Sequence, residues 1–195
     1  MKIAIIGGGV IGGGWASRFL LNGHDVFVFD PDKEAERKMF SMLSNAKRSL
    51  PSLYDYKLPK EGSLEFCSNL ENAVKDAEWI QESVPERLDI KTSVFSEIQK
   101  FCKKTAVIAS STSGFKPSEL NGSSSRPEQI LVCHPFNPVY LLPLVEVVPS
   151  QKTKESIKNK CIDILNQTGM KPLLIRKEID AHIADRLIEA IWRES

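Results

Sequence analysis

A histidine and a glutamate twelve positions apart form the pair of residues best suited to acid–base chemistry. His134 ends the apolar run ILVCH, and Glu146 lies inside a second apolar run, LPLVEVV. A carboxylate in such a run is costly unless it is paired, and a neighbouring strand could place it against the imidazole ring. The pairing would fix the tautomer of the ring. The pattern therefore indicates a general base that takes the proton of a substrate hydroxyl.

Two other polar residues could assist this pair. Ser113 follows the run TAVIASST and could exchange a hydrogen bond with a substrate oxygen, and Asn137 carries an amide suited to holding a substrate or a nicotinamide ring. Taken alone, His134 also fits a structural histidine, Ser113 a turn residue, and Glu146 an edge or partner-facing residue. The catalytic interpretation therefore depends on these residues occurring together.

The start of the chain carries a glycine-rich stretch, IAIIGGGVIGGGW, between an apolar run and a helix-like run. Gly7, Gly9 and Gly12 match the dinucleotide fingerprint, which requires a strand before it and a helix after it. The first glycine permits the tight turn, the second the approach of a pyrophosphate, and the third the packing of helix on strand. The helix N-terminus offers free N–H groups to phosphates. A role in helix–sheet packing alone fits Gly13 and Gly14 but not the whole arrangement.

An aspartate at the end of the next expected strand selects the cofactor. Asp30 can accept hydrogen bonds from ribose hydroxyls and would repel a 2′-phosphate, which favours NAD over NADP. FAD would use the same fingerprint, but a chain of 195 residues lacks room for the usual further flavin contacts. The cofactor-binding residues expected in this region are Gly7, Gly9, Val10, Ile11, Gly12 and Asp30.

Alternating strands and helices must position these groups. Expected strands cover 2–6, 25–29, 64–67, 79–84, 105–112, 130–134, 143–148 and 171–176, and expected helices cover 10–22, 33–50, 70–76, 88–101 and 153–167. This alternation predicts an α/β fold of the Rossmann type: a doubly wound, mostly parallel sheet with helices on both faces. Ligands of such sheets bind beyond the carboxyl ends of the strands, where the run ending at His134 also ends.

The composition is that of an ordinary globular protein, with 42% apolar and 26% charged residues and a net charge of +1. Without a basic or acidic block, charge gives no argument for nucleic acid or an anionic membrane as a partner. We expect no leader and no membrane span. The four cysteines are scattered, which favours free thiols in a reducing cytoplasm and no metal site.

The final segment, EIDAHIADRLIEAIWRES, predicts a helix that Asp180 could cap. Its apolar residues cover a broad part of the circumference, so we expect either that the chain is a fragment or that another subunit covers the helix; a frayed amphipathic terminus is the alternative. The spacing in DAHIAD resembles a metal site, but a helix start with solvated polar residues is preferred. His24, near the start of the chain, is interpreted as a turn residue. The apolar residues of the helix expected in the final segment are Ile183, Leu187, Ile188, Ile191 and Trp192.

Over essentially its whole length the sequence resembles the 3-hydroxyacyl-CoA dehydrogenase family, most closely the branch that oxidises carnitine. The resemblance implies that His134 is the catalytic base, Glu146 its partner, and Ser113 a substrate contact. It also places Glu86 and Lys91 near the nicotinamide, although Lys91 alone could be an exposed helix charge. The blocks that carry the resemblance are GGGVIGGGWASRFLLNGHDVFVFDPD, WIQESVPERLDIK, SSTSGFKPSEL, HPFNPVYLLPLVEVV and KEIDAHIADRLIEAIWRE.

The family also has a C-terminal helical domain that forms the dimer and closes the cleft. The resemblance therefore implies an NAD-binding domain over 1–178, with 179–195 as the start of the first helix of a dimerisation domain that is largely absent. The full-length protein would be a homodimer.

The resemblance implies oxidation of the 3-hydroxyl of carnitine to 3-dehydrocarnitine with NAD. A quaternary ammonium has no N–H donor, so aromatic faces and a carboxylate must recognise it. Phe115, Tyr140 and Trp192 are candidates, although Phe115 and Tyr140 could equally fill the core. Asp185 stands where acyl-CoA enzymes of the family carry an asparagine, which suits a cationic substrate or reflects a changed role. The alternatives are another 3-hydroxy-acid or 3-hydroxyacyl-CoA dehydrogenase, such as L-gulonate 3-dehydrogenase, or a non-catalytic NAD-binding protein like the family's crystallins.

Overall fold

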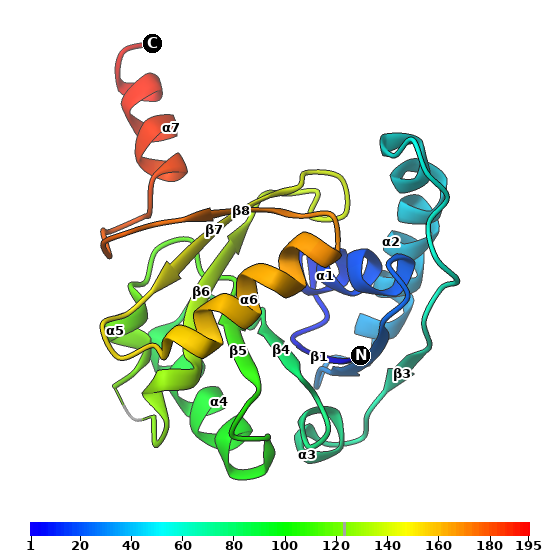
Figure 1. The fold of residues 1–195 in the computed structure, drawn as a ribbon, viewed down its shortest axis with the longest axis horizontal. Coiled ribbons are helices and arrows are strands. Elements are labelled where there is room, and N and C mark those ends of the chain that lie inside the picture. The colour runs from blue at the N-terminus through cyan, green and yellow to red at the C-terminus, as the bar shows by residue number, and fades with distance from the viewer. Residues whose placement is uncertain (123) are drawn as a thin grey trace.

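The computed structural model describes residues 1–122 and 124–195. Across these residues the chain forms one eight-stranded sheet of order β3-β2-β1-β4-β5-β6-β7-β8 (Figure 1). All neighbouring strands are parallel except β6 and β7, which are antiparallel. The central strands are buried on both faces, which explains why their sequences are nearly continuous apolar runs. The strands are β1 (Lys2–Ile6), β2 (Asp25–Phe29), β3 (Leu64–Phe66), β4 (Trp79–Glu82), β5 (Val107–Ser110), β6 (Ile130–Pro135), β7 (Leu144–Pro149) and β8 (Lys171–Leu174).

Helices cover both faces of the sheet and form a separate apolar core on each. One face carries α1 (Val10–Leu21), α2 (Ala35–Ser49) and α6 (Glu155–Gln167). The other carries α3 (Leu70–Val74), α4 (Leu88–Phe101) and α5 (Pro117–Leu120). Two short 3-10 helices span Leu50–Leu53 and Pro127–Gln129. The predicted doubly wound, mostly parallel sheet is confirmed.

The chain reverses its direction of winding between β1 and β4. From β1 it proceeds outward through β2 to β3, and it then crosses back to place β4 on the other side of β1. Ile6 is level with both Phe29 and Glu82, so β1, β2 and β4 end together. The carboxyl ends at such a switch point form the ligand crevice of an open α/β sheet.

The antiparallel pairing of β6 and β7 is what brings the expected catalytic residues together. The connection between the two strands is short, so β7 returns beside β6 as in a hairpin rather than through a helical crossover. His134 lies directly opposite Glu146 in this register. Directly opposite residues of an antiparallel pair project on the same face of the sheet.

The last helix differs from the expectation. Asp180 does not cap it: α7 spans Ala184–Arg193 and its N-cap residue is Ile183. Two residues in the left-handed region, Ala181 (φ 55°) and His182 (φ 51°), turn the chain before the helix begins. The Asp180 carboxylate lies instead 2.7 Å from the Lys116 ammonium.

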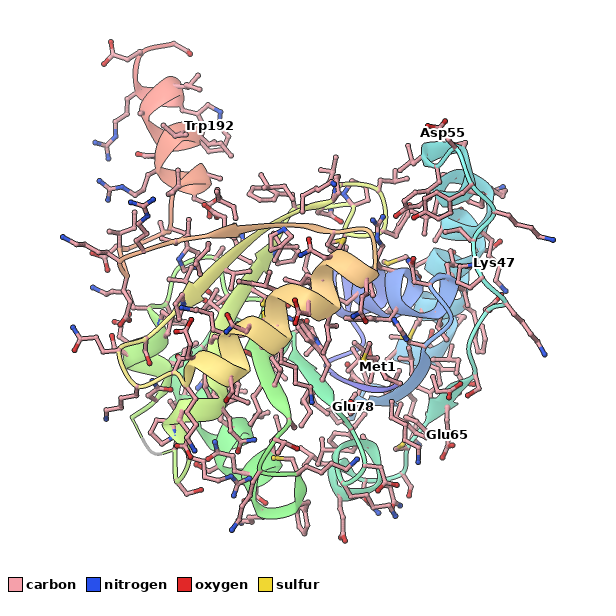
Figure 2. The ribbon with its side chains drawn as sticks, in the orientation of Figure 1. Met1, Lys47, Asp55, Glu65, Glu78 and Trp192 are labelled. Atoms are coloured by element: carbon pink, nitrogen blue, oxygen red, sulfur yellow. The ribbon has the colours of Figure 1, made fainter. Side chains whose placement is uncertain are left out.

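Helix α7 projects from the body of the molecule, and the labelled Trp192 lies on this projection (Figures 1 and 2). Leu187, Ile191 and Trp192 are largely exposed there. Although α7 is apolar on one side, the described residues contain no helix with the length and hydropathy needed to cross a bilayer.

Candidate active site

The glycine stretch forms a tight turn from β1 into α1. Gly7 has a φ of 95°, and a Cβ on it would lie 2.6 Å from the Ser83 carbonyl oxygen. A Cβ on Gly12 would lie 1.8 Å from the Gly7 carbonyl oxygen, so α1 can sit this close to β1 only with glycine there. A Cβ on Gly9, in contrast, would meet no atom of the described residues within 4 Å. Open space at Gly9 is what the close approach of a pyrophosphate requires.

A cavity of about 640 Å³ lies beside this turn, at the switch point of the sheet. Asp30 stands at its wall, where one carboxylate oxygen accepts from the Gly8 N–H at 2.6 Å and the other from the Asp32 N–H at 2.7 Å. Within the described residues no side chain caps α1, which leaves the N–H groups of its first turn available to an anion. These residues fit a dinucleotide. The cavity is lined by Ile6, Gly7, Gly9, Phe29, Asp30, Pro31, Leu70, Ser83, Val84, Pro85, Ile90 and Val94.

His134 and Glu146 form a buried hydrogen-bonded pair. The Nδ1 atom of His134 lies 2.8 Å from Oε2 of Glu146, and the two residues are only 7% and 0% exposed. The other carboxylate oxygen, Oε1, accepts from the backbone N–H groups of Ile183 at 2.9 Å and Ala184 at 3.0 Å. An ionised carboxylate only accepts hydrogen bonds, so a carboxylate at Glu146 assigns the proton to Nδ1 of His134. The Nε2 atom is then the nitrogen able to receive one.

Lys91 is not an exposed helix charge, because its side chain is only 1% exposed. Its ammonium lies 2.7 Å from Oε1 of Glu82 and 3.2 Å from Oε2 of Glu86. Burial raises the pKa of Glu82, against the opposing charge of Lys91. Burial also acts to raise the pKa of Glu86, but the hydrogen bond from Thr112 and the charge of Lys91 outweigh it and lower that pKa. The network ties the ends of β4 and β5 together beside the cavity.

The remaining expected residues lie near the same edge of the sheet. Ser113 follows β5 and is half-buried, and Asn137 follows β6 and is exposed. Phe115 and Tyr140 are also half-buried, each packed against one of the two apolar cores. Asp185 lies in the first turn of α7 and is half-buried.

Two buried residues at this edge have no role assigned from the sequence. His182 is completely buried, so the expectation of solvated polar residues at 180–185 is wrong for it. Its Nε2 lies 3.2 Å from the Thr112 carbonyl oxygen, and burial lowers its pKa. Glu82 is buried at the end of β4, beside the equally buried Gln81. Unlike Glu146, Glu82 lies between Gln81 and Ser83 and is not enclosed by an apolar run. Nothing local in the sequence distinguishes the buried His182 from a solvated histidine.

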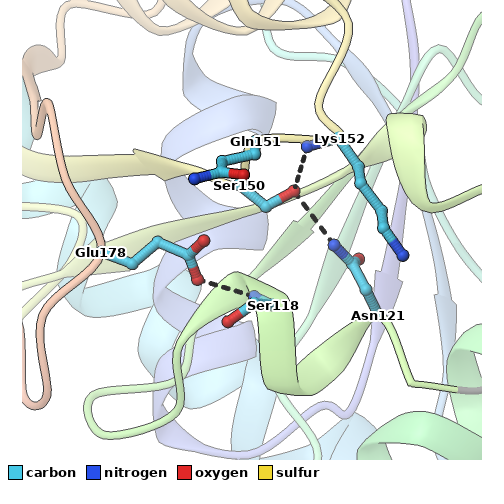
Figure 3. Close-up of a pocket in the computed structure, with 6 residues that line it drawn as sticks. All are labelled: Ser118, Asn121, Ser150, Gln151, Lys152 and Glu178. Atoms are coloured by element: carbon cyan, nitrogen blue, oxygen red, sulfur yellow. Dashed lines mark hydrogen bonds between the residues drawn. The ribbon is translucent and has the colours of Figure 1, made fainter.

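A smaller polar pocket of about 360 Å³ lies between α5, the end of β7 and the segment before α7 (Figure 3). Glu178 crosses it to accept a hydrogen bond from the Ser118 N–H at 2.8 Å. None of the expected cofactor or catalytic residues lines this pocket. The hydrogen bond across it links the segment before α7 to α5. Its lining residues are Ser118, Asn121, Ser150, Gln151, Lys152 and Glu178.

Comparison with known proteins identifies a matching family and several similar relatives. The family model described as the NAD-binding domain of 3-hydroxyacyl-CoA dehydrogenase matches residues 2–179. A protein of Ruegeria pomeroyi named L-carnitine dehydrogenase/betainyl-CoA thioesterase is 60% identical over 98% of this chain, and an L-carnitine dehydrogenase of Mesorhizobium japonicum is 50% identical over 100% of it. This chain spans 39% and 54% of the lengths of these two relatives.

Among solved structures, the fold is similar to that of a 5-formyl-3-hydroxy-2-methylpyridine 4-carboxylic acid 5-dehydrogenase, described as an NAD⁺-dependent dismutase. The two chains are 30% identical and superpose with a TM-score of 0.91 over 99% of this chain and 63% of the other.

Proposed function

The chain belongs to the 3-hydroxyacyl-CoA dehydrogenase family, whose NAD-binding domain it contains, and from this premise we propose that it oxidises the 3-hydroxyl of L-carnitine to 3-dehydrocarnitine. The observation that carries the proposed chemistry is the buried His134–Glu146 pair, at the sheet edge that also holds a cavity fitting a dinucleotide. The substrate is suggested by the names of the relatives at 60% and 50% identity.

In the proposed reaction His134 acts as the general base. Its Nδ1–H donates to Glu146, so Nε2 presents a lone pair that accepts the proton of the substrate hydroxyl. Glu146 stabilises the resulting imidazolium and keeps the ring in one orientation. Ser113 donates a hydrogen bond to the substrate oxygen. Bound NAD⁺ supplies the hydride acceptor.

The cofactor would be held along the carboxyl edge of β1, β2 and β4. The N–H groups of Gly9, Val10, Ile11 and Gly12, in the turn into α1, would donate to the pyrophosphate, and the Asp30 carboxylate would accept from ribose hydroxyls. We assign Glu86, Lys91 and Asn137 to the nicotinamide end.

For the trimethylammonium group we propose an aromatic and acidic environment formed by Phe115, Tyr140 and Asp185. The support is that Phe115 and Tyr140 follow the carboxyl ends of β5 and β6, that Asp185 follows the Ala184 amide bound to Glu146, and that such cations bind to ring faces and carboxylates. Replacing Tyr140 or Phe115 with alanine should raise the KM for carnitine with little effect on the KM for NAD. A normal carnitine KM in both variants would remove these rings from the proposal.

The decisive test is a spectrophotometric assay of NADH formation with carnitine, L-gulonate and 3-hydroxybutyryl-CoA, on this chain and on full-length protein. We expect the highest kcat/KM with carnitine, NAD preferred over NADP, and no turnover in His134→Ala. Turnover of gulonate or of the acyl-CoA instead would reassign the substrate within the family. NAD binding by calorimetry without turnover of any of the three, in full-length protein as well, would favour a non-catalytic NAD-binding protein.

We further propose that residues 179–195 begin a helical dimerisation domain, that the full-length protein is a cytoplasmic homodimer, and that 1–178 is the NAD-binding domain. The support is the exposed apolar surface of α7 and the four free cysteines, which suit a reducing compartment. Light scattering on full-length protein checks the dimer.

A further inference from the structure

His182 is the residue that anchors the turn before α7 in the interior. It is completely buried, whereas Ala181 before it is half-buried and Ile183 after it is exposed. Its Nε2 lies 3.2 Å from the Thr112 carbonyl oxygen, and its ring centroid lies 5.4 Å from that of His134. A carbonyl only accepts hydrogen bonds, so Nε2 of the neutral ring carries the proton. His182 therefore donates to the backbone just beyond β5 while its ring packs beside the catalytic ring.

The same turn supplies the hydrogen bonds that hold Glu146. Ala181 and His182 both adopt left-handed φ angles, which residues other than glycine keep only where their surroundings impose them. The next two N–H groups, those of Ile183 and Ala184, then point at Oε1 of Glu146. The side chain that enters the interior and the amides that reach the carboxylate thus belong to consecutive residues.

Other contacts hold the segment but lie further out. Glu178 accepts from the Ser118 N–H in the polar pocket of Figure 3, and Asp180 pairs with Lys116. The Asp180 side chain is 78% exposed, and exposed ion pairs constrain a chain only weakly. The Ala181 N–H also lies 3.5 Å from the Gly114 carbonyl oxygen, a long hydrogen bond. The contact of His182 with Thr112 is the one in which a completely buried side chain takes part, so we take it as the main anchor of the turn against Glu146.

From this geometry we propose that His182 is a positioning residue for the catalytic pair: it fixes the first turn of α7 on Glu146, and through Glu146 it fixes the tautomer and orientation of the His134 ring. This role deepens the proposed function, and the effect that we expect on turnover rests on that function. Its structural consequence concerns only the ring of His134 and is measurable without a substrate.

Nitrogen NMR of the imidazole rings tests the structural consequence, because the chain has only three histidines, His24, His134 and His182. In the unaltered chain at pH 8 we expect His134 to be in the Nδ1–H tautomer and His182 in the Nε2–H tautomer. In His182→Leu the amides of the turn no longer hold Glu146, so His134 should become a mixture of tautomers. His182→Gln places an amide donor near the former Nε2 and should preserve the single tautomer. His24→Leu, at the opposite end of the parallel strands, is the matched control and should leave His134 unchanged.

Turnover gives the second readout. The kcat of His182→Leu should fall about tenfold or more, as expected when a catalytic group loses its orientation, with a KM for NAD within about twofold of normal. His182→Gln should recover most of the kcat. A leucine variant that keeps both the single His134 tautomer and the normal kcat would overturn the proposal.

If His182→Leu does not fold, His182→Gln and His182→Asn decide the matter. The shorter asparagine cannot reach the Thr112 carbonyl, so only the glutamine variant should keep the single His134 tautomer; identical spectra from the two would overturn the proposal. Absence of carnitine turnover in the unaltered protein would reject the proposed substrate, while the NMR result would still report on the positioning role.

Discussion

At the scale of the residue, Glu146 uses its two carboxylate oxygens for different partners. Oε2 accepts from His134 and Oε1 accepts from two backbone amides. Glu146→Gln keeps the size of the side chain but puts an NH₂ group at one of these positions, so one set of donors loses its acceptor. We expect kcat to fall by roughly 10²–10⁴-fold, as when the carboxylate partner of a catalytic histidine is replaced by an amide.

Affinity for NAD should be unchanged in Glu146→Gln, because none of the hydrogen-bond partners of Glu146 lines the cofactor cavity. Steady-state kinetics measures the loss of kcat, and calorimetry measures the affinity for NAD. The exposed Glu155→Gln serves as the matched control. A normal kcat in Glu146→Gln would show that His134 does not need its carboxylate partner.

The buried pair of Lys91 and Glu82 gives a stability prediction. Both side chains are 1% exposed or less, so Lys91→Met leaves an uncompensated carboxylate in the interior. Removing one partner of a buried pair costs about 3–5 kcal/mol of folding free energy, whereas replacing both is often nearly neutral. Urea unfolding should show a large loss in Lys91→Met and a substantial recovery in the double variant Lys91→Met/Glu82→Gln. Equal losses in the two would indicate that packing of the lysine stem matters more than its charge.

The two non-catalytic histidines predict how stability depends on pH. Burial lowers the pKa of both His24 and His182 below the ordinary value of 6.5. Above that value neither the folded nor the unfolded chain protonates them; below it, the unfolded chain binds protons that the folded chain resists. Stability should therefore fall as the pH drops below about 6.5. Melting temperatures between pH 8 and pH 5 should decline less steeply in His182→Gln. An unchanged slope would show that the folded protein protonates His182 normally.

At the scale of the element, a helix or strand could be predicted from the sequence where the residues that determine it are close neighbours in the chain. The strand β1, the turn at Gly7 and the helix α1 follow from apolar runs and glycine spacing within a few residues of one another. The start of α7 does not: Asp180 has the right type for a cap, but tertiary contacts of Asp180 with Lys116 and of His182 with Thr112 move the first turn to Ala184. The burial of Lys91 likewise depends on Glu82, which lies on a different element.

The β1–α1 turn offers a matched pair of substitutions. Gly12→Ala places a Cβ 1.8 Å from the Gly7 carbonyl, so α1 must move away from β1. Overpacking of this kind typically costs about 1–3 kcal/mol or more, and NAD binding should be lost with it. Gly9→Ala meets open space in the protein, so stability should change little while the new methyl group obstructs the cofactor. Urea unfolding and calorimetry separate the two effects. Normal NAD affinity in Gly9→Ala would place the pyrophosphate elsewhere.

At the scale of the whole molecule, one sheet carries two sites that form in different ways. The cofactor cavity forms at the switch point between β1 and β4, and the catalytic pair forms where β6 meets β7. Arg18 on α1 links the two halves, donating to the carbonyl oxygens of Tyr140 and Thr168 at 3.1 and 2.9 Å. No residue after 178 lines the cofactor cavity. Truncation should therefore separate cofactor binding from positioning of the catalytic pair.

Two truncations test this separation. None of the α7 residues is buried, so a chain ending at Arg186 loses only exposed helix and keeps the amides of Ile183 and Ala184 that bind Glu146. A chain ending at Glu178 loses those amides together with His182. Both should bind NAD within about threefold of the unaltered chain, a difference of less than 1 kcal/mol. The chain ending at Glu178 should melt a few degrees lower than the chain ending at Arg186, which corresponds to about 1 kcal/mol in a domain of this size.

The imidazole spectrum of His134 distinguishes the explanations for any difference between these truncations. The chain ending at Arg186 should keep the single Nδ1–H tautomer, and the chain ending at Glu178 should show a mixture, because only the latter frees Oε1 of Glu146 from its two donors. A mixture in both would mean that the exposed part of α7, rather than the turn at 181–184, holds the carboxylate in place. Loss of NAD binding in either would show that the cofactor cavity depends on the C-terminal segment after all.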